Sequence, residues 1–382
     1  MTAGASLGGR CDPRFAAVGD AFADNFAERD EVGAAVCVAV DGRVVADLWG
    51  GQAAADRAWG PDTLVNAFSV GKGFVALLVA RLVGEGQLDL DVPVATVWPE
   101  FAQAGKDAIT VRQLMTHQAG LPSAHDRLPP GIMLDWGRMT AALAAEAPWW
   151  EPGTAHGYHV NTFGFLVGEV LRRCTGRSVG ELLRRHVTGP LDADVHVGLE
   201  ATDDHRVAEF AWPGDAPPET QPELEGFELM RYNAYWNPSG ISGAGVVNTR
   251  AWRAAEMPST NTHASARGIT RVYQALAAGG TIDGTTVVDG AALAEATEEQ
   301  VSGPDVVLER ESRFGVGFQL TQTGRPLGPN PGAFGHFGAG GSVGFCDPES
   351  GVAFGYVMNQ IGARWQNPRN RALIDAVFDS LA

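Results

Sequence analysis

The clearest alternation of apolar and polar positions near the start of the chain lies in VGAAVCVAVDGRVVADLWGG, residues 32–51. Apolar and small residues run on both sides of Asp41-Gly42, a dipeptide typical of a tight hairpin turn. This stretch therefore predicts two antiparallel strands. Similar stretches return near the other end of the chain, in RFGVGFQLTQ, FGHFGAGGSVGFCDPE and GVAFGYVMNQ. We expect strands from both ends of the chain.

Helical spacing dominates between these strands. Apolar residues recur three and four positions apart over 74–86, which predicts a helix ended by Gly84 and Gly86. Further helices are predicted over 110–117, 137–146, 161–175, 178–186, 264–279 and 369–381. Residues 200–245 are irregular, and WPGDAPPETQPELEGFE within them is typical of a long acidic surface loop.

Strands at both ends with helices between them predict an α/β fold. Residues 1–75 and 265–382 would form a discontinuous α/β lobe with an antiparallel sheet. Residues 76–264 would form an inserted, mostly helical lobe. We expect the active site in the cleft between the two lobes.

Composition narrows the choice of partner. The 382 residues carry a formal net charge of -17, which opposes binding to nucleic acid or to an anionic membrane and favours a small-molecule partner. The N-terminus does not resemble a secretory signal, and the longest apolar run, FVALLVARLV, is too short to cross a bilayer. We expect a cytoplasmic protein. The sequence does not indicate its oligomeric state.

The metal-binding residue types form no ligand pattern. The four cysteines are far apart and include no C-x-x-C pair, which favours neither a zinc site nor a disulfide framework. The segment HGYH, 156–159, has no acidic partner at ligand spacing. We expect neither a metal nor a cofactor.

A serine and a lysine three residues apart stand at the start of the helix predicted over 74–86. Residues three apart share one helix face, so the amine of Lys72 can reach the hydroxyl of Ser69. The helix dipole favours an alkoxide at Ser69, and burial moves Lys72 toward the neutral form that a base needs. Only two lysines occur in the chain, and arginine could not replace one as a base. The alternative is a helix-capping serine beside a solvated lysine.

A second serine also matches a nucleophile pattern. Residues 340–344, GGSVG, fit G-x-S-x-G, the nucleophile elbow of α/β-hydrolases, in which the catalytic histidine follows the serine. All nine histidines here precede Ser342, so the elbow hypothesis fails. We expect Ser342 in a glycine-rich strand turn, where the glycines allow close backbone approach.

Several stretches together resemble a known family. FSVGKGF resembles the S-x-x-K motif of serine β-lactamases and penicillin-binding proteins. LMTHQAGLP resembles a segment of the class C branch, YHVNTFGFLVGEVLRRCTGRS its tyrosine motif, and FGHFGAGGSVGFCDPESGVAFGYVMNQ its terminal strand pair. The resemblance extends from about residue 20 to 380 and is strongest to the family VIII carboxylesterases. It implies a β-lactamase-like (transpeptidase-like) fold.

The resemblance also implies roles for individual residues. Ser69 would be the acylated nucleophile, Lys72 its base, and Tyr158 a partner in proton transfer. The backbone N–H groups of Ser69 and Ala339 would form the oxyanion hole. His336 and Gly338 lie in the third motif, where we expect substrate contacts.

Two departures from the class C pattern stand out. Its Y-x-N motif would need asparagine at 160, where this chain has Val160; an alternative alignment starts the motif at His159 and displaces Tyr158. We prefer Tyr158, because a phenol can relay a proton. His336 replaces the lysine of K-T-G and is largely neutral at pH 7. Both changes weaken recognition of a β-lactam and favour a neutral ester or lactone.

Polar and aromatic residues elsewhere supply further candidates. Gln118 and Asn261 lie in loops that the family places near the cleft, and two alternatives stand for the tryptophans, core packing or a pocket wall. The tryptophan candidates for the pocket wall are Trp149, Trp150, Trp236 and Trp365.

The resemblance predicts a serine carboxylesterase that hydrolyses short or medium-chain esters through an acyl-Ser69 intermediate, and the shared mechanism allows a weak β-lactamase side activity. The open alternatives are acyl transfer by the same acyl-enzyme, β-lactamase or peptidase activity, and a catalytically silent scaffold or binding protein of the same fold.

Overall fold

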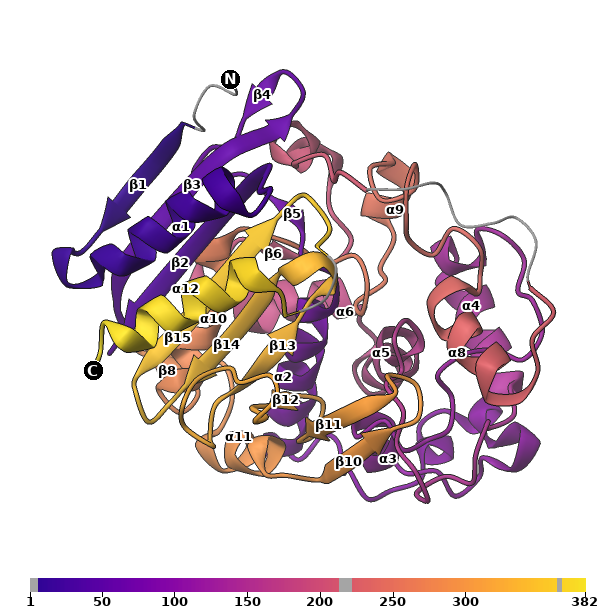
Figure 1. Ribbon diagram of the computed structural model, residues 1–382. Coiled ribbons are helices and arrows are strands. Elements are labelled where there is room, and N and C mark those ends of the chain that lie inside the picture. Colours follow the sequence, from indigo (N-terminus) through magenta and orange to yellow (C-terminus); the bar gives the residue numbers. More distant parts are fainter. Residues whose placement is uncertain (1–5, 213–221, 363–365) are drawn as a thin grey trace.

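One large antiparallel sheet forms the body of the protein (Figure 1). The computed structural model describes residues 6–212, 222–362 and 366–382. The strands of this sheet are β1 (Leu7–Cys11), β2 (Gly33–Val40), β3 (Arg43–Ala54), β4 (Arg57–Ala58), β10 (Val301–Asp305), β11 (Arg310–Phe314), β12 (Gln319–Leu320), β13 (Phe334–Phe337), β14 (Val343–Asp347) and β15 (Val352–Met358). Their order is β1-β3-β2-β15-β14-β13-β12-β11-β10, with β4 beside β3. Strands from the two ends of the chain meet where β2 pairs with β15, as predicted.

The hairpin predicted at Asp41-Gly42 is confirmed. Val40 pairs with Arg43, so the connection has two residues. Asp41 has φ 47° and Gly42 has φ 77°, the left-handed conformation that a tight hairpin turn requires. Every residue of β15 is buried, because helices cover both faces of the sheet there.

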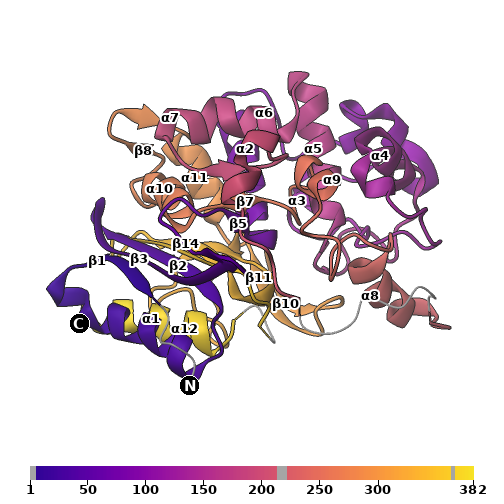
Figure 2. The ribbon, with the colours of Figure 1, turned by 90° about the horizontal axis from the view of Figure 1, so that it is seen from above.

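Helices lie on both faces of this sheet (Figure 2). On one face α1 (Ala16–Glu28) packs against α12 (Pro368–Asp379) and β3. On the other face α10 (Ala266–Ala277) packs on β2, β14 and β15, while α2 (Gly71–Gly84) contacts β13 and α11 (Gly290–Thr297). Helix α2 is apolar around nearly its whole circumference and is buried accordingly.

A second, mainly helical part lies beside the sheet and α2 (Figure 1). Its helices are α3 (Val111–Met115), α4 (Trp136–Ala145), α5 (Thr162–Thr175), α6 (Val179–Leu183), α7 (Gly189–Leu191), α8 (Gly226–Trp236) and α9 (Arg250–Ala254). The short strands are β5 (Val65–Asn66), β6 (Val195–His196) and β7 (His263–Ala264), which pair together, and the hairpin of β8 (Thr281–Ile282) and β9 (Thr285–Thr286). The predicted helices are confirmed to within a few residues; the residue limits of the two lobes stay a prediction.

The region 200–245 differs from its prediction. Helix α8 occupies Gly226–Trp236, where the sequence suggested only irregular structure. The buried positions of α8 are Met230, Asn233 and Ala234. Their helical spacing follows a run of proline, glycine and acidic residues, which is why the sequence did not predict this helix. Residues 213–221 of the predicted acidic loop lie outside the described residues. Among the helices that the structure describes, none is long and apolar enough to cross a membrane.

Candidate active site

Ser69 lies on a tight turn in front of α2. The turn Phe68–Val70 is a single 3₁₀ turn, and Phe68 has φ 51°, a conformation that costs energy in a bulky residue and that occurs preferentially at functional sites. The positions on either side of Lys72 require glycine for steric reasons. A Cβ on Gly71 would lie 2.1 Å from Thr262 Oγ1, and one on Gly73 would lie 2.5 Å from the Tyr273 hydroxyl oxygen. Close packing therefore fixes the start of α2.

Lys72 is buried and its amine touches the serine. Its Nζ lies 3.1 Å from Ser69 Oγ, 2.6 Å from the Val160 carbonyl oxygen and 3.3 Å from that of Ser259. Burial lowers the pKa of Lys72 well below its ordinary value. A neutral amine has two N–H groups, which the two carbonyls accept, and one lone pair, which is left for the Ser69 proton. The arrangement is that of a nucleophile and its base.

Tyr158 lies over the same amine. Lys72 Nζ is 4.7 Å from the centre of the Tyr158 ring. Burial raises the pKa of the phenol well above its ordinary value, and a hydrogen bond with Ser69 opposes that shift. The phenol therefore stays protonated and can pass a proton at the nucleophile.

The alternative motif start, His159, has a different environment. Its Nε2 accepts the Leu121 N–H at 3.0 Å, and its Nδ1 lies 2.7 Å from the Gly157 carbonyl oxygen. Burial lowers the pKa of His159 to about 4. Both ring nitrogens serve the local backbone, so the geometry favours Tyr158.

A cavity of about 710 Å³ opens above Ser69, a size suited to a small molecule. Apolar and aromatic walls come from Phe68, Trp212, Tyr235, Trp236, Leu308 and Ile361. Polar and charged groups on the wall include Asn161, Ser242, Thr260, Glu309 and Arg310. The cavity is thus mainly apolar, with a few polar groups beside the nucleophile.

Ala339 shares this cavity with Ser69. It starts the turn Ala339–Gly341 that follows β13. A Cβ on the preceding Gly338 would lie 2.2 Å from the Ala67 carbonyl oxygen, so glycine lets this turn approach the chain just before Ser69. The two backbone N–H groups expected to form the oxyanion hole therefore belong to adjacent segments.

Four expected substrate contacts do not lie on the described cavity wall. Asn261 is fully buried and donates to the carbonyls of Trp252 and Ala255. Gln118 accepts a hydrogen bond from Thr116 Oγ1 at 2.9 Å. Gly338 serves backbone approach, as described above.

His336 is buried behind Tyr158, with ring centres 5.9 Å apart, and its Nδ1 lies 2.7 Å from the Phe337 carbonyl oxygen. None of Gln118, Asn261, Gly338 and His336 lines the described cavity, and their contacts with substrate stay a prediction. Burial and the nearby Lys72 lower the pKa of His336, which keeps it neutral.

The tryptophan candidates separate clearly. Trp236 lies on the cavity wall, whereas Trp149 stacks on His125 with ring centres 3.7 Å apart and Trp150 donates to the Ala155 carbonyl. Trp365 lies outside the described residues.

Ser342 is the rival nucleophile, and it lies away from the cavity wall. It is fully buried between the turn Ala339–Gly341 and β14, and its carbonyl accepts the Gly338 N–H at 2.7 Å. The prediction of a glycine-rich strand turn is confirmed.

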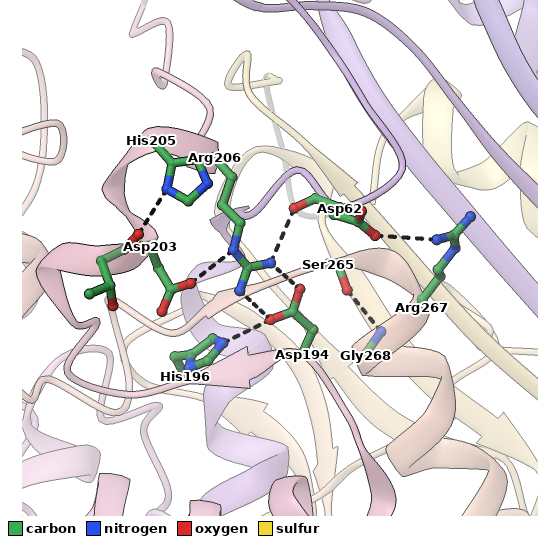
Figure 3. Close-up of polar contacts among 10 residues, drawn as sticks. Asp62, Asp194, His196, Asp203, His205, Arg206, Ser265, Arg267 and Gly268 are labelled. Carbon is green, nitrogen blue, oxygen red and sulfur yellow. Dashed lines mark hydrogen bonds and ion pairs between the residues drawn. The ribbon is translucent and has the colours of Figure 1, made fainter.

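A larger cavity, of about 1200 Å³, lies at the start of α10 and has a different character. Several of its charged side chains form ion pairs (Figure 3). Arg206 binds Asp194 at 2.5 Å and Asp203 at 2.9 Å, and Arg267 lies 3.5 Å from Asp62. This cavity is larger than the one at Ser69, but its wall carries no serine with a buried lysine beside it.

Sequence reasoning missed several residues of the site. The Ser259 carbonyl oxygen lies 3.3 Å from both Ser69 Oγ and Lys72 Nζ, yet backbone carbonyls leave no signal in a sequence. Trp212 and Tyr235 were also missed. The aromatic pair Tyr235-Trp236 could have been found as a group, since both residues line the cavity.

Fold and site together define a β-lactamase-like protein with a serine beside a buried lysine. The chain belongs to the Beta-lactamase family, whose model matches residues 20–377. It is 36% identical over 370 residues to the esterase/beta-lactamase LipL of Mycobacterium tuberculosis, covering 94% of this chain and 84% of that protein.

Two solved structures are also similar. The first is a penicillin-binding protein homolog from Caulobacter crescentus, with a TM-score of 0.91, 43% identity and coverage of 98% of this chain and 100% of that one. The second is a family VIII carboxylesterase, with a TM-score of 0.90, 42% identity and the same coverage. The resemblance seen in the sequence motifs is confirmed.

Proposed function

We propose that this protein is a serine carboxylesterase that hydrolyses short or medium-chain esters through an acyl-Ser69 intermediate. The observation that carries the proposal is the buried amine of Lys72, 3.1 Å from Ser69 Oγ. Ser69 itself lines a cavity of a size suited to a small molecule. The names of the similar proteins, an esterase/beta-lactamase and a family VIII carboxylesterase, support the same activity.

The reaction follows from the positions of the groups. Ser69 Oγ attacks the ester carbonyl carbon while its proton passes to Lys72, and the N–H groups of Ser69 and Ala339 bind the oxyanion. The tetrahedral intermediate collapses, the bond to the alcohol oxygen breaks, and that oxygen takes a proton through Tyr158. Water then attacks the acyl carbon and gives a proton to Lys72. The bond between that carbon and Ser69 Oγ breaks, Ser69 Oγ takes the proton back, and the acid leaves.

The cavity supports a neutral ester over a β-lactam. His336, at the place of the K-T-G lysine, is neutral and buried behind Tyr158, so it offers no fixed charge for a carboxylate. Position 160 contributes its carbonyl to Lys72, and its valine side chain has no amide with which to bind a substrate amide. A weak β-lactamase activity remains part of the proposal.

The test is hydrolysis of p-nitrophenyl esters of graded acyl length beside a chromogenic cephalosporin. We expect turnover of short esters, slow turnover of the cephalosporin, and loss of about 10³-fold or more of the esterase rate in Ser69→Ala. Ser342→Ala is the matched control and should keep its activity. Faster turnover of the cephalosporin would identify a β-lactamase, and no turnover of either substrate would favour an acyltransferase or a binding protein.

A further inference from the structure

Asp305 is a fully enclosed carboxylate at the end of β10, and its exposed fraction is 1%. Its oxygens accept the backbone N–H of Tyr158 at 3.1 Å and those of Val307 and Leu308 at 2.9 Å. They also accept the Ser312 hydroxyl at 3.0 Å. A buried carboxylate with this many donors holds its neighbours in one arrangement.

These bonds join two distant parts of the chain. Asp305 lies on the sheet strand β10, whereas Tyr158 lies in the segment just before α5 (Figure 1). Two further contacts support the junction: the Val306 N–H donates to the His156 carbonyl at 3.1 Å, and His156 Nε2 lies 2.8 Å from Ser312 Oγ. The segment that carries the tyrosine is therefore fastened to the sheet at Asp305.

The same carboxylate also shapes the cavity. By accepting the N–H groups of Val307 and Leu308, it fixes the turn that leads to Leu308, Glu309 and Arg310 on the cavity wall. The Tyr158 ring stacks against Phe314, with ring centres 6.1 Å apart. Its backbone N–H is bound by Asp305.

We propose that Asp305 is a positioning residue that holds Tyr158 in place for proton transfer at Ser69. This inference rests on the proposed function. It assigns the effect of Asp305 on the reaction to the tyrosine rather than to the nucleophile or the base. Removing the carboxylate should let the tyrosine segment move away from the Ser69 and Lys72 pair, and misplacement of about 1 Å can cost 10²-fold in rate.

Two substitutions separate hydrogen bonding from charge. Asp305→Ala removes every acceptor. Asp305→Asn keeps one oxygen for the three backbone N–H groups, and its amide can donate to Ser312 Oγ. We expect Asp305→Ala to slow labelling of Ser69 by a fluorophosphonate about 30-fold, and Asp305→Asn to restore it to within about threefold of wild type.

Asp347 supplies the matched control. It is a buried aspartate of the same sheet whose carboxylate binds Asn330 and Ser350, neither of which lines the cavity at Ser69. Asp347→Ala should lose thermal stability to a similar extent while its labelling rate stays near wild type.

The deciding experiment is a double-mutant cycle with Tyr158→Phe, read as the labelling rate. If Asp305 acts through the tyrosine hydroxyl, Asp305→Ala should change the rate of Tyr158→Phe by less than about twofold. An equal slowing on both backgrounds would overturn the inference, as would a wild-type rate in Asp305→Ala. Ser312→Ala, a milder variant that removes one donor, supports the inference if it slows wild type but not Tyr158→Phe, and opposes it if it slows both. A wild-type protein that does not label at all would instead overturn the proposed function.

Discussion

The two lysines of this chain, Lys72 and Lys106, are both fully buried, but their amines contact different groups. Lys106 donates to three backbone carbonyls, those of Gln103, Ala144 and Glu146. Lys72 donates to two backbone carbonyls, and its amine also lies beside a serine hydroxyl. Each amine also lies over an aromatic ring, Phe101 at 5.2 Å for Lys106 and Tyr158 at 4.7 Å for Lys72.

The difference separates a structural lysine from a chemical one. Lys106 satisfies the carbonyls at the end of α4, where a cation is favourable. Burial lowers its pKa to about 8, and Glu146 opposes that shift. Lys72 has no such carboxylate among the causes of its lowered pKa, which is set by burial. A base therefore results from what surrounds the amine rather than from burial alone.

The largest expected effect is at Lys72. Lys72→Met removes the base, and kcat/KM for a p-nitrophenyl ester should fall about 10³-fold. The melting temperature should fall modestly, because the Val160 and Ser259 carbonyls lose their donor, so the rate is measured on the folded variant. A variant that keeps most of its activity would show that Lys72 is as structural as Lys106.

Tyr158→Phe gives Lys72 the same aromatic neighbour that Lys106 has. We expect about 10²-fold slower acylation, measured as the burst rate with a p-nitrophenyl ester, since the phenol no longer helps to take the proton from Ser69. Tyr273→Phe is the control, because Tyr273 is equally buried and packs on Phe74. Equal loss in both variants would contradict a special role for Tyr158.

The pH dependence tests the charge state of Lys72 directly. Its pKa in the folded protein lies well below its ordinary value, so the neutral base is present at pH values where a free lysine is charged. Activity should be level over the alkaline range up to pH 10 and fall about tenfold per pH unit once the pH drops below the folded pKa. A rate that still climbs tenfold per unit up to pH 10 would mean that Lys72 titrates as an ordinary lysine.

The wall of the cavity beside Ser69 should have a smaller effect than the groups that move protons. Trp236→Ala enlarges the cavity and should shift the preferred acyl length upward. We expect the ratio of kcat/KM for long esters to that for short esters to rise about fivefold. Trp149→Ala, whose indole donates to the Ser123 carbonyl away from the cavity wall, should leave the ratio unchanged. A shift in the control alone would move the acyl site to Trp149.

Lys106→Met should have the smallest effect on catalysis. Three carbonyls lose their donor, so the free energy of unfolding should fall by about 1 to 3 kcal/mol, measured by denaturant titration. The esterase rate should stay within about twofold of wild type, because Lys106 touches no group of the reaction. A folded variant with a large loss of rate would remove the distinction between the two lysines.

Local patterns in the sequence predicted most of the fold and the centre of the site. The three-residue spacing of Ser69 and Lys72 predicts their contact because helix geometry is local. The pairing of β2 with β15 was expected only in outline, since strand order depends on contacts between distant segments. Helix α8 was missed because charged and proline-rich neighbours masked its pattern.

The surroundings of other polar candidates could not be predicted, for a physical reason. Gln118 and Asn261 are polar residues in loops, and sequence does not say whether such a side chain binds a ligand or, as in both cases here, other groups of the protein. His336 lies on a strand of the expected pair, but it is buried and does not line the described cavity. The bond of Asp305 to Tyr158 spans 147 residues and leaves no local signal.

The most direct test of the account is mass spectrometry of the protein quenched during turnover of a p-nitrophenyl ester. The account predicts one acyl group per chain, located by peptide mapping on Ser69, with no adduct in Ser69→Ala and accumulation reduced in Lys72→Met. An acyl group on Ser342 or on any other residue of wild type, or hydrolysis that continues unchanged in Ser69→Ala, would contradict it.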